Sequence, residues 1–211
     1  EGQERANPIL TTRFEAEMDS AGPGKWRGGV GVRKVSSMLD SANTVISYIC
    51  DRERAVVWGI EGGLPSMPHG LALKRAGADA PEWLGATFSD VPIGPGDEFD
   101  RPTAGGGGFG DPLERDPEKV LEDVIDEYVS VDRAAKDYGV IVIPVDPEIC
   151  EYELDLEATK AEREKIRAAR LGWFKAAPED VAEDYRSGKI DKLDAVRRHA
   201  VILDWETGEL L

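Results

Sequence analysis

The sequence has 211 residues, 41% of them apolar, and it carries a formal net charge of −16 at pH 7. An acidic chain repels other polyanions, so this charge argues against nucleic-acid and anionic-membrane partners. No apolar run approaches the roughly 20 residues that cross a bilayer, and the start shows no signal-peptide pattern, which together favour a cytoplasmic protein. Because the first residue is Glu1, we expect the sequence to begin after processing or within a longer polypeptide.

The composition changes near residue 111. Residues 1–110 hold 19 of the 23 glycines and eight of the 13 prolines, with 11 basic and 15 acidic side chains, a net charge of −4. Residues 111–211 hold 15 basic and 27 acidic side chains, a net charge of −12. We therefore expect an α+β fold, with a sheet-rich module with long Gly/Pro loops over 1–110 and an acidic helical extension over 111–211.

Short alternating apolar and polar runs predict antiparallel strands in the first region. The predicted strands are Ile9–Asp19, Val30–Leu39, Thr44–Cys50 and Arg54–Ile60. From Glu61 to Asp111 glycine and proline recur so often that we expect loops to dominate. A loop region of this length in a compact domain is typical of a functional or docking surface.

The helical region contains an internal repeat. Residues 117–142 and 178–203 align without a gap at a spacing of 61 residues, and each predicts a helix, a turn, a second helix and a short strand. Pro117 and Pro178 occupy equivalent first helical turns, where a missing N–H costs nothing. Between the repeats, Leu156–Gly172 has strong helical composition, with Gly172 as the expected C-terminal cap.

Few residue types suited to catalysis are present. Cys50 and Cys150 are too far apart for a CxxC site, and we interpret both as buried structural thiols. His199 stands where the other repeat has Tyr138, which indicates a packed aromatic ring. His69 lies in the loop region, and one histidine alone cannot build a metal site, although it could join ligands on another chain. We therefore assign no catalytic residue and no metal ligand.

The stretch TAGGGGFGDPLERDP, Thr103 to Pro117, poses the question of a phosphate site. A Walker A loop needs Lys followed by Ser or Thr after its last glycine, whereas Asp111 and Pro112 follow Gly110 here. A dinucleotide-binding turn passes directly from strand to helix, and Pro112 prevents that. The run instead predicts a backbone that bends sharply or approaches a neighbour where a Cβ would clash.

Four segments carry a family resemblance. They are SAGPGKWRGGVGVRK, WGIEGGLPS, PGDEFDRPTAGGGGFGDPLERDPEKVLEDV and VDRAAKDYGVIV, in this order. Together they resemble the C-terminal third of the hydantoinase B/oxoprolinase family over about residues 7–143. The ending, with WFKAAPEDVAEDY and HAVILDWETGELL, resembles the large subunits of the acetone and acetophenone carboxylase branch.

This resemblance implies a subunit of an ATP-dependent complex. In the family a hydantoinase A-like, actin-like partner binds ATP and Mg, so these cofactors are expected on the partner, and a divalent metal is expected elsewhere in the complex. The family's metal-binding segments belong to the earlier two-thirds of the B-type polypeptide, so the remaining hydantoinase B-like portion is a further expected partner in a hetero-oligomer.

Three functions stay open. The first is a subunit of an ATP-dependent ketone carboxylase, which the C-terminal extension favours. The second is a subunit of an ATP-dependent hydantoinase or 5-oxoprolinase, and the third is a non-catalytic assembly subunit. In each case we expect a loop surface near the active site or an interface, formed by Glu61, Gly62, Gly63, His69, Gly105, Gly106, Gly107, Gly108, Phe109, Gly110 and Asp111.

Overall fold

The computed structural model describes residues 2–40, 43–173 and 175–211. It combines antiparallel strands with helices, which confirms the α+β prediction. The chain forms two compact units, and each unit is assembled from three separate segments. We call them unit 1 (residues 1–17, 31–56 and 68–104) and unit 2 (residues 18–30, 57–67 and 105–211).

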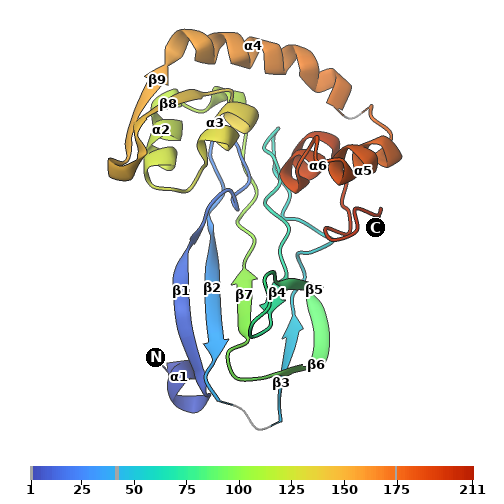
Figure 1. The fold of residues 1–211 in the computed structure, drawn as a ribbon. Helices are drawn as coiled ribbons and strands as arrows, with labels where there is room; N and C mark the ends of the chain where they lie inside the picture. Colours follow the sequence, from blue (N-terminus) through green and yellow to red (C-terminus); the bar gives the residue numbers. More distant parts are fainter. Residues whose placement is uncertain (1, 41–42, 174) are drawn as a thin grey trace. The chain divides into compact units, whose positions relative to one another are not determined.

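Unit 1 is built on antiparallel strands (Figure 1). A five-stranded sheet has the order β1-β2-β7-β4-β5, with the bounds β1 Ile9–Glu17, β2 Gly31–Met38, β7 Glu98–Pro102, β4 Leu71–Lys74 and β5 Glu82–Gly85. A second pair joins β3 (Thr44–Ile49) to β6 (Thr87–Ile93), and the short helix α1 (Gly2–Ala6) precedes β1. Side chains from β2, β4, β6 and β7 form its buried core, namely Met38, Leu71, Leu73, Ile93 and Phe99.

The first three predicted strands are confirmed within two residues at each end, but the fourth is wrong. Arg54–Ile60, all of which the structure describes, forms no strand, and Ile60 alone makes a single β-bridge, to Phe109. The chain leaves unit 1 after Val56 and enters unit 2, so this segment has no continuous neighbouring strand to pair with.

Residues outside strands outnumber those in strands over Glu61–Asp111, as the prediction of a loop-dominated region requires, but the prediction missed β4, β5, β6 and β7, which lie there. These strands are short and include Pro92 and Pro102, which hide the alternation that a sequence reader counts. Pairing of β7 with β2 and β4, of β5 with β4 and of β6 with β3 holds these strands in their sheets. Tertiary pairing therefore outweighs local turn propensity in this region.

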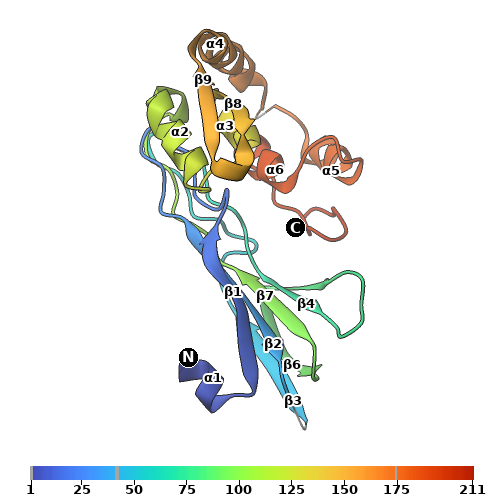
Figure 2. The same cartoon turned by 60° about the vertical axis from the view of Figure 1, so that its left-hand side comes forward.

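Unit 2 contains the remaining elements. They are η1 (Pro112–Glu114), α2 (Pro117–Ile125), α3 (Val131–Tyr138), β8 (Ile141–Asp146), η2 (Pro147–Ile149), β9 (Glu151–Asp155), α4 (Leu156–Trp173), α5 (Pro178–Arg186) and α6 (Lys192–His199). The β8–β9 hairpin lies beside α2 and α3 (Figure 2). Val120, Tyr138 and Val142 belong to the core under this hairpin, while Val181, Ala195 and Leu203 belong to a second core at α5 and α6.

The helix pairs of the repeat are confirmed down to their backbone conformation. Ser130 and Asp191, 61 residues apart, both cap a second helix by accepting a hydrogen bond from the N–H three residues later. Gly139 and Ala200, also 61 apart, both end it in the left-handed region, at φ 61° and 56°. The duplicated sequence therefore encodes a duplicated structure.

The two repeats differ after the second helix. The first continues into β8, whereas the second makes only one β-bridge, between Leu203 and Leu210. The chain reverses between them, because the N–H of Gly208 donates to the carbonyl of Asp204 at 2.7 Å. A tight turn thus replaces the strand expected in the second repeat.

The helix expected over Leu156–Gly172 is confirmed as α4, but Gly172 lies inside it rather than capping it. Side chains on α4 fasten it to the rest of unit 2. The Arg163 guanidinium donates to the carbonyls of Tyr138 and Arg115 at 3.1 and 2.6 Å. The hydroxyl of Thr159 accepts the N–H of Ile141 at 2.9 Å.

Buried ion pairs join α3 to α6. Arg133 donates to Asp194 at 3.0 Å, and Arg197 donates to Asp137 at 2.6 Å, so each helix contributes one cation and one anion. These four side chains are 5% exposed or less. Arg133 also pairs with Asp191. Although burial alone would raise the pKa of Asp191, the hydrogen bond from the Asp194 N–H, Arg133 and Lys136 hold it below its ordinary value. A charge at this depth is tolerated only when it is fully paired.

Arg197 has a second role, as a clamp on two loops. Its guanidinium donates to the carbonyls of Asp19 and Ala21 at 2.7 and 2.8 Å, and to that of Pro65 at 3.2 Å. The planar fork of arginine suits several acceptors at fixed angles. One side chain of α6 therefore fixes the loops that begin at residues 18 and 57.

Replacing Arg197 by methionine tests this clamp. We expect Arg197→Met to lower the free energy of unfolding by about 3–5 kcal/mol, because Asp137 and three backbone carbonyls lose their buried donor. Urea denaturation at pH 7 measures the loss.

The matched control is Lys189→Met. Lys189 pairs with Asp184 at the surface, so its loss should cost less than about 1 kcal/mol. Equal effects of the two substitutions would contradict the clamp.

Candidate functional site

Three loop segments of unit 2 pack against one another through their glycines. We call residues 18–30, 57–67 and 105–110 the glycine layer. A Cβ added to Gly107 would lie 1.7 Å from the carbonyl oxygen of Trp58, and one added to Gly108 would lie 1.9 Å from that of Pro23. Real Cβ atoms do not approach a backbone this closely. The glycines are therefore required by the contact between loops.

Hydrogen bonds between the loops use most of the amides of the glycine run. The N–H groups of Gly105, Gly106, Gly108, Phe109 and Gly110 donate to backbone carbonyls of the other two loops at 2.8–3.3 Å. A phosphate cradle needs such N–H groups free to point at the ligand. The amides of this run are instead spent on the protein's own backbone.

Asp111 ends the glycine run and fixes it to helices. Its carboxylate receives two hydrogen bonds from Arg170 of α4, both of 2.7 Å, and caps η1 by accepting the N–H of Leu113 at 2.8 Å. Although burial alone would raise the pKa of Asp111, these bonds hold it below the ordinary value. Asp111, whose negative charge would repel a phosphate, thus anchors the loop.

Glu61 and Gly62 form the tip of the middle loop. Both have positive φ angles, 53° and 89°, and the N–H of Gly63 returns to the carbonyl of Ile60 at 3.0 Å. The sharp turn leaves both tip residues exposed. It brings Gly63 against Gly108, where an added Cβ would lie 2.1 Å from the carbonyl oxygen.

Large apolar side chains project from the layer into solvent. Phe109 forms β-bridges to Trp26 on one side and to Ile60 on the other, so the three residues stand in a row across the three loops. They are 50%, 65% and 63% exposed. We call Trp26, Phe109 and Ile60 the apolar row. Adjacent exposed apolar side chains on a rigid backbone are typical of a contact surface.

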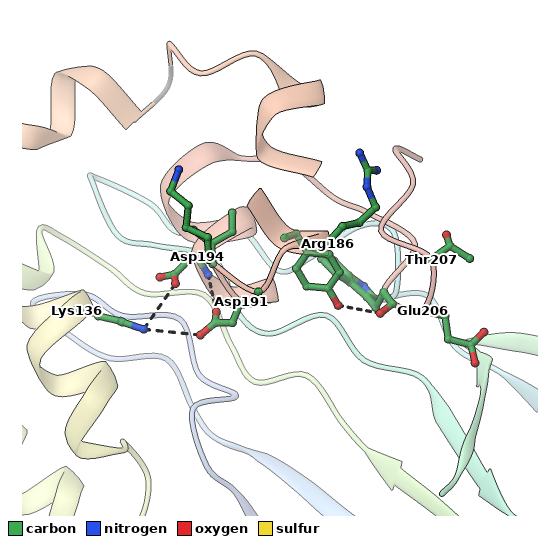
Figure 3. Close-up of a pocket in the computed structure, with 11 residues that line it drawn as sticks. Lys136, Arg186, Asp191, Asp194, Glu206 and Thr207 are labelled. Atoms are coloured by element: carbon green, nitrogen blue, oxygen red, sulfur yellow. Dashed lines mark hydrogen bonds and ion pairs between the residues drawn. The ribbon is translucent and has the colours of Figure 1, made fainter. Parts of the chain in front are cut away.

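A groove of about 640 Å³ lies on α5, α6 and the C-terminal turn, and Lys136 of α3 also lines it (Figure 3). Figure 3 shows Lys136 pointing toward Asp191 and Asp194. Its Nζ lies 4.0 Å from Oδ2 of Asp191 and 3.7 Å from Oδ2 of Asp194. Lys189, also in the lining, pairs with Asp184. These two lysines are paired with neighbouring carboxylates, whereas Arg186, also in the lining, donates to the carbonyl of Gly208 at 2.9 Å.

The two cysteines and the two histidines differ in how deeply they are buried. The prediction that both thiols are buried is wrong for Cys150, which is exposed at the turn after η2, and Cys50 is half-buried. His69 is buried, and its Nε2 lies 3.1 Å from the sulfur of Cys50. His199 is half-buried, with Nδ1 2.8 Å from the carbonyl oxygen of Trp173.

Sequence reasoning found the glycine run but missed several of its partners. The clamp by Arg197 has no local signature, because its acceptors lie far away in the sequence. Trp26, in GPGKWRGG, is a tryptophan that the sequence indicates as a core or interface anchor, whereas the Ile60 side chain of the apolar row was missed. His69 lies in unit 1, whereas all other members of the expected site belong to unit 2.

Among the residues that the structure describes, no three His, Cys, Asp or Glu side chains are arranged so that they could hold a metal ion. Within the same residues, no helix is both long and apolar enough to span a membrane.

Comparison with known proteins finds relatives along most of the chain. A protein of Methanocaldococcus jannaschii is 34% identical over 74% of this chain, and the caprolactamase subunit beta of Pseudomonas jessenii is 32% identical over 66%. The acetone carboxylase alpha subunit of Xanthobacter autotrophicus is 25% identical over 90%. The chain spans about a quarter of the length of these relatives, between 24% and 28%.

Two solved structures share the fold. A nucleotide-free structure of acetone carboxylase superposes with a TM-score of 0.69, at 23% identity, over 89% of this chain and 29% of that one. The ATP-dependent caprolactamase of Pseudomonas jessenii superposes with a TM-score of 0.63, at 32% identity, over 76% of this chain and 27% of that one.

The family itself follows from a match that covers more than half of the chain. The sequence pattern of the hydantoinase B/oxoprolinase family matches residues 1–112, which include the glycine run and the two loops that pack on it. The chain therefore belongs to the hydantoinase B/oxoprolinase family.

Proposed function

We propose that this chain is part of the B-type subunit of an ATP-dependent ketone carboxylase complex of the acetone/acetophenone carboxylase type. One observation carries the proposal, namely the fraction of this chain that each relative matches. The acetone carboxylase alpha subunit matches 90% of the chain, whereas the caprolactamase subunit matches 66%. The structural matches differ in the same direction, at 89% and 76%.

A relative that matches only two-thirds or three-quarters of the chain leaves a large part of its 211 residues without a counterpart. The C-terminal extension is a built part of the molecule, because α5, α6 and the segment after α6 provide the second core of unit 2. Arg197 of α6 also holds two loops of the glycine layer. An extension that supports the layer belongs to the working unit rather than to a dispensable tail.

The second candidate is a subunit of an ATP-dependent hydantoinase or 5-oxoprolinase. Its support is sequence identity, since the caprolactamase subunit, whose name denotes a cyclic amide substrate, is 32% identical against 25% for the carboxylase subunit. A non-catalytic assembly role is the third. In all three, a hydantoinase A-like subunit binds ATP and Mg.

Within such a complex, the expected role of the layer is to form an interface. The residues proposed from the sequence, Glu61 to Gly63 and Gly105 to Asp111, lie in or directly beside the glycine layer. The layer carries the apolar row, and its amides are used internally. We therefore place the nucleotide on the partner and a contact surface on the glycine layer, and His69, which is buried in unit 1, is not part of that surface.

Substrate specificity can be decided by assaying the complex purified from its source. We expect ATP-dependent incorporation of labelled bicarbonate into an acid-stable carboxylate when acetone or acetophenone is supplied. The same preparation is tested with hydantoin and with 5-oxoproline, and native mass spectrometry identifies its components.

The two leading candidates give opposite results. ATP-dependent opening of a cyclic amide without bicarbonate fixation would overturn the carboxylase proposal in favour of the hydantoinase. Turnover that persists in a complex lacking this chain would favour the assembly role.

A double substitution of the apolar row tests the interface. We expect Trp26→Ser with Phe109→Ser to weaken association with the rest of the complex at least about tenfold, because truncated aromatic anchors lose more than about 1.4 kcal/mol of binding. The assembled fraction is measured by native mass spectrometry across a dilution series.

Ile149→Ser is the control for surface hydrophobicity. Ile149 is 69% exposed in η2, outside the layer and the row, so its substitution should leave association unchanged. If the control weakens association as much as the row variant, the row is not the interface.

Two alanine substitutions separate a structural glycine from a permissive one. Gly107→Ala should destabilise the protein by about 1–3 kcal/mol and lower the assembled fraction, because its Cβ would overlap the backbone of Trp58. Gly29→Ala meets nothing within 4 Å and should have no effect. ATP affinity of the assembled Gly107→Ala fraction should equal that of the wild type, and a selective loss of ATP binding with assembly intact would contradict us.

A further inference from the structure

A cysteine and a histidine meet in unit 1, in a place that the proposed function does not use. Cys50 directly follows β3, and its N–H donates to the carbonyl of Ala86 at 2.7 Å, which fixes its backbone. The N–H of His69 donates to the carbonyl of Arg52 at 3.1 Å. These two bonds hold the residues so that the Cys50 sulfur lies 3.1 Å from Nε2 and 3.9 Å from Nδ1 of His69.

A pocket opens beside the sulfur. It has a volume of about 400 Å³ and is lined by Cys50, Asp51, Glu53, Arg54, Ala86 and Thr87. Cys50 lines the pocket and is half-buried, whereas His69 is only 3% exposed and lies outside this lining. A small molecule in the pocket therefore contacts Cys50, and the ring is shielded from bulk water.

The chemistry of such a pair is proton transfer from thiol to imidazole. The thiolate is the nucleophilic form of cysteine, and a neighbouring imidazolium stabilises it. Tyr48 precedes Cys50 by two residues in the extended chain, so both side chains lie on one side. The pKa of Tyr48 is raised to about 12, first by burial and then by the Cys50 thiol, so its hydroxyl keeps its proton and can donate to a thiolate.

Other charged groups surround the pair. Glu53 is engaged by the Trp83 indole N–H at 3.1 Å and the Ala86 N–H at 2.9 Å. Asp51 opposes a thiolate from the pocket wall, while Arg54 and, beside Tyr48, Arg101 favour it. The pocket therefore carries both negative and positive side chains, and the group in direct contact with the Cys50 sulfur is His69.

We propose that Cys50 is a nucleophilic thiol activated by His69, and that it is a modification site for small electrophiles of the peroxide class. The thiol proton moves to Nε2 of His69, and the thiolate attacks one peroxide oxygen. The S–O bond forms as the O–O bond breaks. The departing hydroxide takes the proton from His69 and leaves as water. Cys50 is oxidised to a sulfenic acid while the peroxide is reduced.

The exposed Cys150 provides an internal reference in the same chain. It lies at a surface turn outside the Cys50 pocket, and its greater exposure favours faster reaction by access alone. The test treats the protein in its complex with iodoacetamide at pH 7 and follows each cysteine by peptide mass spectrometry. We expect Cys50 to be alkylated at least about fivefold faster than Cys150.

A pH series from 5.5 to 9 on the wild-type protein tests the proposal without any substitution. The rate at Cys50 should reach half of its plateau at a lower pH than the rate at Cys150, because His69 stabilises the thiolate. Hydrogen peroxide followed by a sulfenic-acid probe should label Cys50 in preference to Cys150. Equal rates and coinciding pH profiles would overturn the proposal.

Two substitutions assign the effect to the ring. His69→Gln should lower the rate at Cys50 at least about fivefold while leaving Cys150 unchanged, because the proton acceptor is lost. Tyr48→Phe keeps the ring and should cause a smaller loss. If His69→Gln folds and alkylation of Cys50 stays as fast as in the wild type, His69 does not activate the thiol.

Discussion

The guanidinium of Arg197 is the interaction on which unit 2 depends most. Transfer of a cation into the interior is costly unless every donor finds an acceptor. Here the acceptors are one carboxylate, on Asp137, and the carbonyls of Asp19, Ala21 and Pro65. The charge therefore organises both the helical extension and the loops, and neither can adopt its observed form without the other.

The glycine layer obeys a different constraint, which is distance between backbones. Loops that approach within hydrogen-bonding range over several consecutive residues leave no room for side chains between them. Gly107 and Gly108 satisfy this requirement, and the side chain of Phe109 is carried at the surface instead. A closely packed backbone interior with aromatic groups outside is well suited to recognition by shape. It is poorly suited to holding a phosphate.

Features coded by nearby residues were predictable from the sequence. The prolines that open α2 and α5 are local signals, and they located both helix pairs correctly. Asp111 and Pro112 after Gly110 likewise argue locally against a phosphate cradle. In each of these cases, the residues that determine the structure lie within one or two helical turns.

Features created by distant partners were not predictable. Strands β4 to β7 depend on pairing with one another and with β2 and β3, and their own sequences resemble loops. Arg54–Ile60 alternates like a strand but crosses between the two units. The contact of Cys50 with His69 joins residues on different segments of unit 1, and a sequence alone does not set their separation.

The long sequence separation between Arg197 and the carbonyls that it binds has a consequence for protein synthesis. It lies 178 residues after Asp19 and 132 after Pro65. At about 5–20 residues per second, roughly 7–26 s pass on the ribosome between Pro65 and the residue that completes its loop. The carbonyls of Asp19, Ala21 and Pro65 lack their arginine donor throughout this interval. The nascent chain thus exposes loops that Arg197 has not yet fixed, and a chaperone would have reason to shield them.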